Sequence, residues 1–114
     1  MRVKKFYLRL SSEDAVLARL KKDKNMLKDV LIVYFARIND EVRQIFRVDC
    51  AHGFLHRDLL FLRPPKKELI EAPLSGKLVS GILEELKLNW KEYRKKFIRN
   101  YFEGRAYGSQ EKRN

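Results

Sequence analysis

Residues 29–50 read DVLIVYFARINDEVRQIFRVDC, and this stretch decides the fold. Residues 29–38 are rich in β-branched and aromatic side chains, which favour a central strand. Asn39 and Asp40 both tolerate positive φ angles, so they predict a tight hairpin turn. Residues 41–50 form the return strand. We expect its core face to carry Val42, Phe46, Val48 and Cys50, and its other face Arg43, Arg47 and Asp49.

Further strands are predicted on both sides of this hairpin. In residues 3–10, apolar and polar side chains alternate with the period of two that is typical of a strand. Residues 55–63 form the next strand of the meander, which Pro64 and Pro65 end because proline cannot donate to a ladder. Residues 66–72 form a short strand suited to an edge of the sheet.

Two helices are predicted. Residues 13–21 follow two serines that are good N-cap residues, so we expect a short helix, followed by a basic loop or frayed helix end at 21–28. The longest helix covers 77–103 and ends at Gly104. Its apolar stripe has the steps of three and four of an amphipathic helix: Val79, Ile82, Leu83, Leu86, Trp90, Tyr93, Phe97 and Tyr101.

The predicted order is therefore β-α-β-β-β-β-α. A mostly antiparallel sheet of four to five strands, packed by the long C-terminal helix, satisfies the layer rule for a two-layer α+β domain. The length of 114 residues fits a single domain, which we place at 1–104, with 105–114 as a disordered basic tail. An antiparallel sheet with an edge strand also permits a homodimer.

Composition excludes several classes of protein. No apolar run approaches the roughly 20 residues of a membrane span, and no secretory signal is visible. One cysteine excludes an internal disulfide framework and suits a reducing cytoplasm. These features argue against a membrane protein, a disulfide scaffold and a multidomain enzyme.

The net charge of +11 indicates a polyanionic partner, most simply nucleic acid, with RNA favoured over DNA. The simpler alternative is a heavily solvated surface, because a charged residue content of 36% resembles that of thermophile proteins. The candidate nucleic-acid contacts form two basic patches, each of which is either a solvated face or a row of phosphate contacts. They are Lys21, Lys22, Lys24 and Lys28, and on the long helix Lys87, Lys91, Arg94 and Lys95.

Both histidines and the only cysteine fall within residues 49–58, DCAHGFLHRD. Gly53 supplies the freedom for a sharp turn. Since side chains alternate along a strand, His56 and Asp58 share one face and Arg57 points to the other unless the turn twists it round. The candidate catalytic residues are Asp49, His52, His56, Arg57 and Asp58.

Three interpretations of this cluster stay open. Acid–base catalysis suits histidine, which titrates nearest to neutral pH, and RNA cleavage by the 2′-hydroxyl needs a base, an acid and a cation. A metal site would use Cys50, His52, His56 and Asp58, but the spacing matches no standard zinc finger. In a structural role, the histidines would cap turn carbonyls and Cys50 would be a small hydrophobe. No cofactor is expected, because no P-loop, GxGxxG, HExxH or GxSxG motif occurs.

The stretch FRVDCAHGFLHRDLLFLRPPKKE, followed by LNWKEYRKKF in the long helix, resembles a family of small prokaryotic proteins with a D-x-A-H-G-x-x-H-x-D junction. That resemblance covers residues 29–103. More loosely, the chain is similar to the TumE-type toxins of toxin–antitoxin modules. The resemblance implies a toxin that acts on RNA or translation and is neutralised by an antitoxin, and it points to Asp49, His52, Gly53, His56 and Asp58.

The leading hypothesis is thus a cytoplasmic, toxin-like, metal-independent endoribonuclease that uses a histidine pair. The alternatives are a non-catalytic nucleic-acid-binding module, which would use the two basic patches, and a protein-interaction domain.

Overall fold

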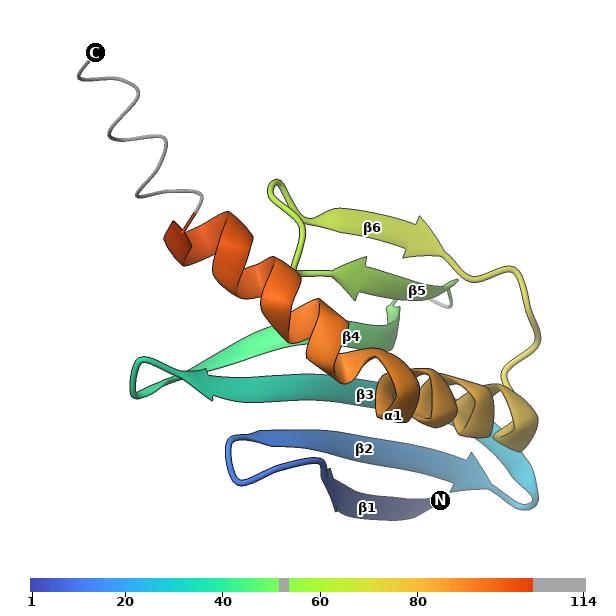
Figure 1. The fold of residues 1–114 in the computed structure, drawn as a ribbon. Coiled ribbons are helices and arrows are strands. Elements are labelled where there is room, and N and C mark those ends of the chain that lie inside the picture. Colours follow the sequence, from blue (N-terminus) through green and yellow to red (C-terminus); the bar gives the residue numbers. More distant parts are fainter. Residues whose placement is uncertain (52–53, 104–114) are drawn as a thin grey trace.

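The computed structural model describes residues 1–51 and 54–103 (Figure 1). Within them the chain forms one antiparallel sheet in which the strands follow each other in sequence order, and one long helix. The elements are β1 (Arg2–Arg9), β2 (Asp14–Asp23), β3 (Met26–Ile38), β4 (Glu41–Ala51), β5 (Phe54–Leu59), β6 (Lys66–Leu69), α1 (Gly76–Ile98) and the π-helical turn η1 (Arg99–Glu103).

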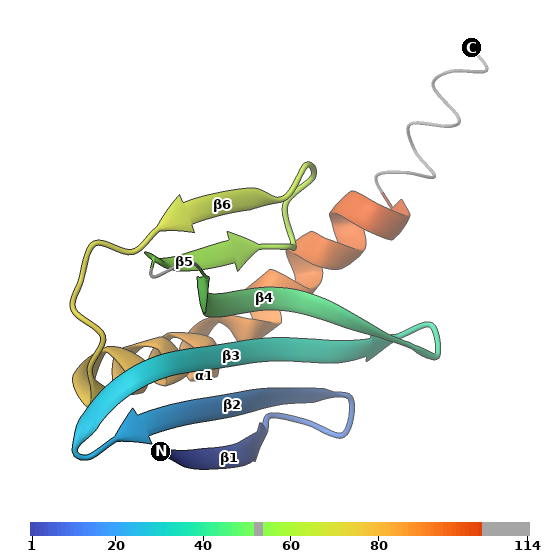
Figure 2. The ribbon, with the colours of Figure 1, turned by 180° about the vertical axis from the view of Figure 1, so that it is seen from behind.

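The molecule has two layers. Figure 1 shows α1 lying across one face of the sheet, where it packs on β3 and β4. Figure 2 shows the sheet from behind, with none of the described helical residues over its second face. The predicted α+β class is confirmed, with a 6-stranded sheet where four to five strands were expected.

The short helix predicted at 13–21 is wrong, because these residues form β2. Apolar side chains at 16, 17 and 20 fit a helical stripe, but Val16 and Ala18 also alternate, and both are fully buried under α1. Pairing with β1 and β3 satisfies the β2 backbone on both sides. A helix at these residues would leave the backbone groups of β1 and of one edge of β3 without their partner strand. The loop predicted at 21–28 is a continuation of the β2–β3 hairpin, with Lys24 in its turn at φ 58.

The turn predicted at Asn39 and Asp40 is confirmed, with φ angles of 53 and 64. The face assignment of β4 is wrong in its first half. A register shift pairs Tyr34 with Phe46 but Phe35 with Gln44, which leaves Ile45 as an extra residue. Because of this extra residue, the side chains of β4 before the bulge point to the opposite faces from those that strict alternation predicts.

Three consequences of this bulge are visible in β4. Ile45 and Phe46 are both fully buried, although they are adjacent in the chain. Val42, expected in the core, is 63% exposed. Arg43, expected on the other face, pairs with buried Ala36 and lies over the ring of Phe102. Beyond the bulge the assignment holds, because Val48 is fully buried and Cys50 packs against the core.

The C-terminal half follows the predicted order with shorter strands. β5 ends at Leu59 and β6 at Leu69, and β6 lies at an edge of the sheet as expected. Ser75 caps α1 by accepting a hydrogen bond from the Leu78 amide. The predicted stripe faces the sheet, with Val79, Ile82, Leu86 and Phe97 buried and Leu83, Trp90, Tyr93 and Tyr101 partly buried. Gly104 and the tail predicted at 105–114 lie outside the described residues.

A buried polar network links α1 to the strands β2 and β3. The Asp14 side chain is 3% exposed, and it accepts hydrogen bonds from the Tyr34 hydroxyl at 2.6 Å and from Arg94 at 3.0 Å. Burial, and secondly the hydrogen bond to Asp14, raises the pKa of Tyr34. Arg94 is therefore a structural tie in α1, which limits its use as a nucleic-acid contact.

None of the described helical segments combines the length and the apolar character that a membrane crossing requires.

Candidate functional site

Strand register sorts the side chains onto the two faces of the sheet, because directly paired residues of antiparallel strands point the same way. One row across the sheet faces α1 and consists of Phe6, Ala18, Ile32, Val48, Arg57 and Glu68. The next row points away from the helix and consists of Lys5, Arg19, Leu31, Asp49, His56 and Leu69. A second outward row consists of Tyr7, Leu17, Val33, Arg47, Asp58 and Lys67. We call the whole face of the sheet that these outward rows belong to, opposite α1, the open face.

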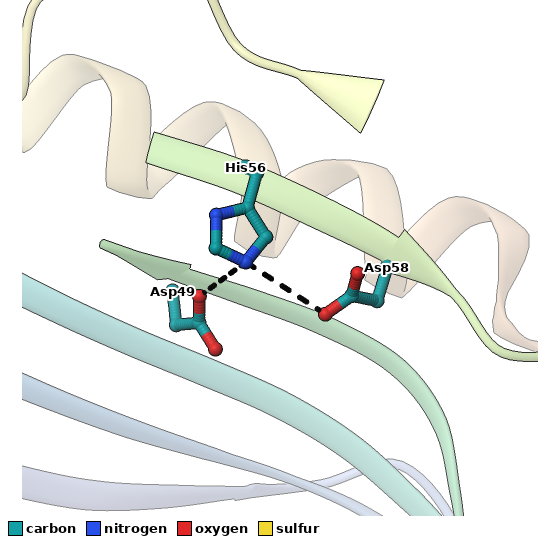
Figure 3. A group of neighbouring side chains, drawn as sticks. All are labelled: Asp49, His56 and Asp58. Carbon is teal, nitrogen blue, oxygen red and sulfur yellow. Dashed lines mark ion pairs between the residues drawn. The ribbon is translucent and has the colours of Figure 1, made fainter. Parts of the chain in front are cut away.

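The candidate site is a polar cluster on the open face (Figure 3). His56 on β5 stands opposite Asp49 on β4, and Asp58 lies two residues further along β5. The imidazole Nε2 is 2.7 Å from Asp49 Oδ1 and 3.9 Å from Asp58 Oδ2. The residue His56 is only 9% exposed. The structure thus brings together three of the predicted site residues.

Two cations complete the cluster. Arg47 Nε donates to Asp49 Oδ2 at 2.7 Å, which holds that carboxylate in place. Lys67 on β6 brings its ammonium group to 3.5 Å from His56 Nε2 and 3.7 Å from Asp58 Oδ1. The Lys67 side chain is 67% exposed, so this cation is accessible to a ligand.

Two neighbours of His56 Nε2 favour opposite tautomers of the ring. Oδ1 of Asp49 is buried and accepts no well-aligned hydrogen bond, although Nε2 lies 2.7 Å away. A carboxylate at that distance favours the form in which Nε2 carries a proton, since the alternative sets a lone pair against an anion. In that form the lone pair of the neutral ring is on Nδ1. The Lys67 ammonium, which is a donor 3.5 Å from Nε2, favours the other form.

The same three side chains could hold a metal ion. One ligand atom each from Asp49, His56 and Asp58 falls within 4.8 Å of the others, and a nitrogen with two carboxylate oxygens is a plausible donor set. Lys67 already supplies a positive charge beside this cluster, and a metal would compete with it. Cys50, a weak metal candidate from sequence, pairs with Leu55 and packs against the core on the opposite face.

Arg57 lies on the helix face, apart from His56. Its guanidinium forms an ion pair with Glu85 of α1 and lies 5.0 Å from the centre of the Phe46 ring. The Tyr93 hydroxyl donates to the same carboxylate at 2.6 Å, and burial, then this bond, raises the pKa of Tyr93. Arg57 therefore belongs to a helix–sheet tie, and the catalytic role proposed for it from sequence has no geometric support. His52 and Gly53 lie outside the described residues.

The basic patches predicted from sequence lie on separate surfaces. Lys87, Lys91 and Lys95 are exposed on α1, and Lys22, Lys24 and Lys28 are exposed at the β2–β3 hairpin end. Lys21 is 3.9 Å from Asp29. Sequence analysis missed Lys67 and Arg19, since assigning 13–21 to a helix concealed the outward row of β2. Alternation along 14–23 was the signal that could have found Arg19.

The fold and the cluster define a small α+β protein with a histidine–carboxylate–lysine group on the face of an antiparallel sheet opposite its helix. The chain belongs to the DUF7718 family, a domain of unknown function whose model matches residues 1–103. No curated protein and no solved structure matches it.

Proposed function

We propose that this protein is a metal-independent endoribonuclease in which His56 is the acid–base residue. One observation carries the proposal: the imidazole of His56 lies 2.7 Å from Asp49 and beside an accessible lysine, on the face of the sheet that α1 leaves open, in a chain with a net charge of +11. A positioned imidazole is the commonest general acid or base, and a basic chain attracts a polyanionic substrate.

The cluster supplies two of the functions that cleavage of RNA needs. Nδ1 of His56 accepts the proton of a ribose 2′-hydroxyl while its oxygen attacks the adjacent phosphorus. The Asp49 carboxylate, 2.7 Å from Nε2, stabilises the imidazolium that results. The ammonium group of Lys67 stabilises the negative charge that develops on the phosphoryl oxygens. The bond to the 5′-oxygen breaks, that oxygen takes a proton from water, and a 2′,3′-cyclic phosphate remains.

This chemistry also favours RNA over DNA, because DNA lacks the attacking 2′-hydroxyl. The looser resemblance to TumE-type toxins supports the same assignment, since it points to Asp49, His56 and Asp58, and these three residues form the cluster. We therefore propose a cytoplasmic toxin-like role in which an antitoxin protein restrains the nuclease.

Cleavage of a long structured RNA tests the proposal, with wild type and His56→Asn compared with and without EDTA. We expect cleavage to survive EDTA and to slow by about 10²–10⁴-fold in the variant, the usual contribution of a general base. Lys67→Ala should slow cleavage about tenfold or more. Lys66→Ala is the matched control, because Lys66 is the adjacent lysine of β6 but lies across from Leu59 on the helix face.

Each result separates the candidate functions. Loss of cleavage in EDTA, restored by zinc, would assign Asp49, His56 and Asp58 to a metal centre. Absence of cleavage by folded wild type would support the non-catalytic nucleic-acid-binding module. The 9% exposure of His56 favours that second candidate, since a nearly buried imidazole also suits a structural link between β4 and β5.

A further inference from the structure

The open face carries several large exposed hydrophobic side chains. Most large exposed hydrophobic side chains of the described residues lie there, and each is 58–65% exposed. They are Val3, Tyr7, Val42, Phe54 and Leu69. Their strand positions place them outward, as Val3 pairs with Lys21 and Leu69 with His56. Such a surface on one side of a small domain indicates a binding site.

Cations are interleaved with these apolar side chains at the β1–β2 end. Lys5 and Arg19 stand directly opposite each other, and Arg9 follows on the same side of β1. Within residues 1–51 and 54–103, neither Lys5 nor Arg19 forms an ion pair. Like charges directly across two strands destabilise a sheet, and an anion placed between them removes that cost.

We infer that the open face binds single-stranded RNA, with phosphates on Lys5, Arg9 and Arg19 and bases stacked on Tyr7 and Phe54. This inference rests on the proposed function, because the same face carries His56. From β1 to β5 the strand spacing gives a path of about 19 Å, so a strand held at Tyr7 reaches the cluster. Flat aromatic side chains contact bases only where these are unpaired, so a duplex offers this surface little beyond its phosphates.

The outer side of α1 is a weaker candidate for the same ligand. Its lysines alternate with Glu84 and Glu92, and Lys87 lies 4.0 Å from Glu84. Its large exposed apolar residue is Leu88, which cannot stack a base as an aromatic ring does. The open face combines cations and aromatic rings, as single-strand binding requires.

Binding to a fluorescein-labelled RNA of about 15 nucleotides tests the inference. The RNA carries 2′-O-methyl sugars, which prevents 2′-hydroxyl attack, and is compared with a hairpin of equal length. We expect the single strand to bind at least about tenfold more tightly than the hairpin, and Tyr7→Ala to weaken it roughly five- to a hundredfold. Leu88→Ala, the matched exposed change on α1, should leave affinity unchanged.

A charge comparison completes the test. The double variant Lys5→Gln/Arg9→Gln should weaken binding and reduce its salt dependence, whereas Lys87→Gln/Lys91→Gln removes equal charge from α1 with little effect. Equal affinity for hairpin and single strand, or a larger loss from the α1 pair, would overturn the inference. So would a dimer in sedimentation that Tyr7→Ala dissociates, because the open face would then bind a second copy.

The binding experiment and the cleavage experiment can contradict the two proposals independently of each other. Single-strand binding that depends on Tyr7, with no cleavage of unmodified RNA, supports the platform and rejects the nuclease. Cleavage that depends on His56, with binding indifferent to Tyr7 and to Lys5 and Arg9, rejects the platform and supports the nuclease.

Discussion

Along β4, Phe46 and Val48 face α1 and are fully buried, whereas Arg47 and Asp49, which alternate with them, lie on the open face. Both faces carry charged groups, but they use them differently. On the helix face, Asp14 and Arg57 are each closed into a network with α1. On the open face, the ion pairs that Asp49 and Arg47 form with described residues are all within the sheet itself.

This difference indicates which charges stabilise the fold and which we propose for contacts with a ligand. Removing one member of a buried ion pair is strongly destabilising, because it leaves the other charge buried with neither a partner nor water to compensate it. The open-face pair is less buried than the pair of Arg94 with Asp14, since the side chains of Arg47 and Asp49 are 35% and 20% exposed and that of Asp14 is 3% exposed. Its loss is therefore expected to cost less. The helix face is therefore the structural side of the sheet, and the open face has the groups that function can use.

The largest expected effect contrasts two phenylalanines. Phe46→Ala removes a fully buried ring that stacks on Tyr93, and should cost about 3–5 kcal/mol in the free energy of unfolding. Phe54→Ala removes a ring that is 65% exposed and should change stability by less than about 0.5 kcal/mol. Urea denaturation of both variants measures this. Similar losses would show that the open face is covered in solution.

The next effect contrasts two arginine–aspartate pairs. Arg94→Met keeps the length and helix propensity of the side chain but leaves the nearly buried Asp14 with two hydroxyl donors, Tyr34 and Ser11. It should cost about 3 kcal/mol. Arg47→Met breaks the partly buried open-face pair with Asp49, which still has His56 beside it, and should cost less, about 1–2 kcal/mol. A larger loss in Arg47→Met than in Arg94→Met, measured by urea denaturation, would reverse the roles assigned to the two faces.

A third effect depends on pH and comes from the helix face. Burial raises the pKa of Tyr34, so the folded state retains a proton that the unfolded state loses above its pKa of about 10. The stabilisation is complete below that pH and declines as pH rises through it, by up to about 1.4 kcal/mol per unit. Unfolding measured from pH 8 to about 11 should therefore be less steep in pH for Tyr34→Phe. An identical slope in both proteins would show that Tyr34 ionises freely in the fold.

Local sequence patterns predict much of this fold, and long-range pairing decides the rest. The hairpin at 29–50 and the helix stripe are evident because β-branched runs, a two-residue turn and steps of three and four are local signals. β2 was missed because its apolar residues fit both periods, and pairing with β1 and β3 chooses between them. Local propensity contains no such information.

The candidate site likewise has one part that local sequence patterns predict and one part that depends on long-range strand pairing. Alternation from Leu55 predicts that His56 and Asp58 share a face and that Arg57 leaves it, and the structure places them so. Lys67 joins them only through the pairing of β5 with β6 across a proline-containing turn, and that register cannot be read from the residues alone. The surface that we propose for RNA could not be predicted either, because assigning residues 13–21 to a helix removed the outward-facing side chains of β2 from the sheet.

The smallest effect tests the bulge that reverses β4, since the two halves of this strand are predicted to differ. Val48→Thr places a hydroxyl among fully buried side chains and should cost about 1–3 kcal/mol. Val42→Thr changes a side chain that is 63% exposed on the open face and should stay within about 0.5 kcal/mol. Equal losses at the two valines would mean that strict alternation holds along β4 and that Ile45 is not an extra residue. Because the change in chemistry is the same at both positions, the difference between them reports burial alone.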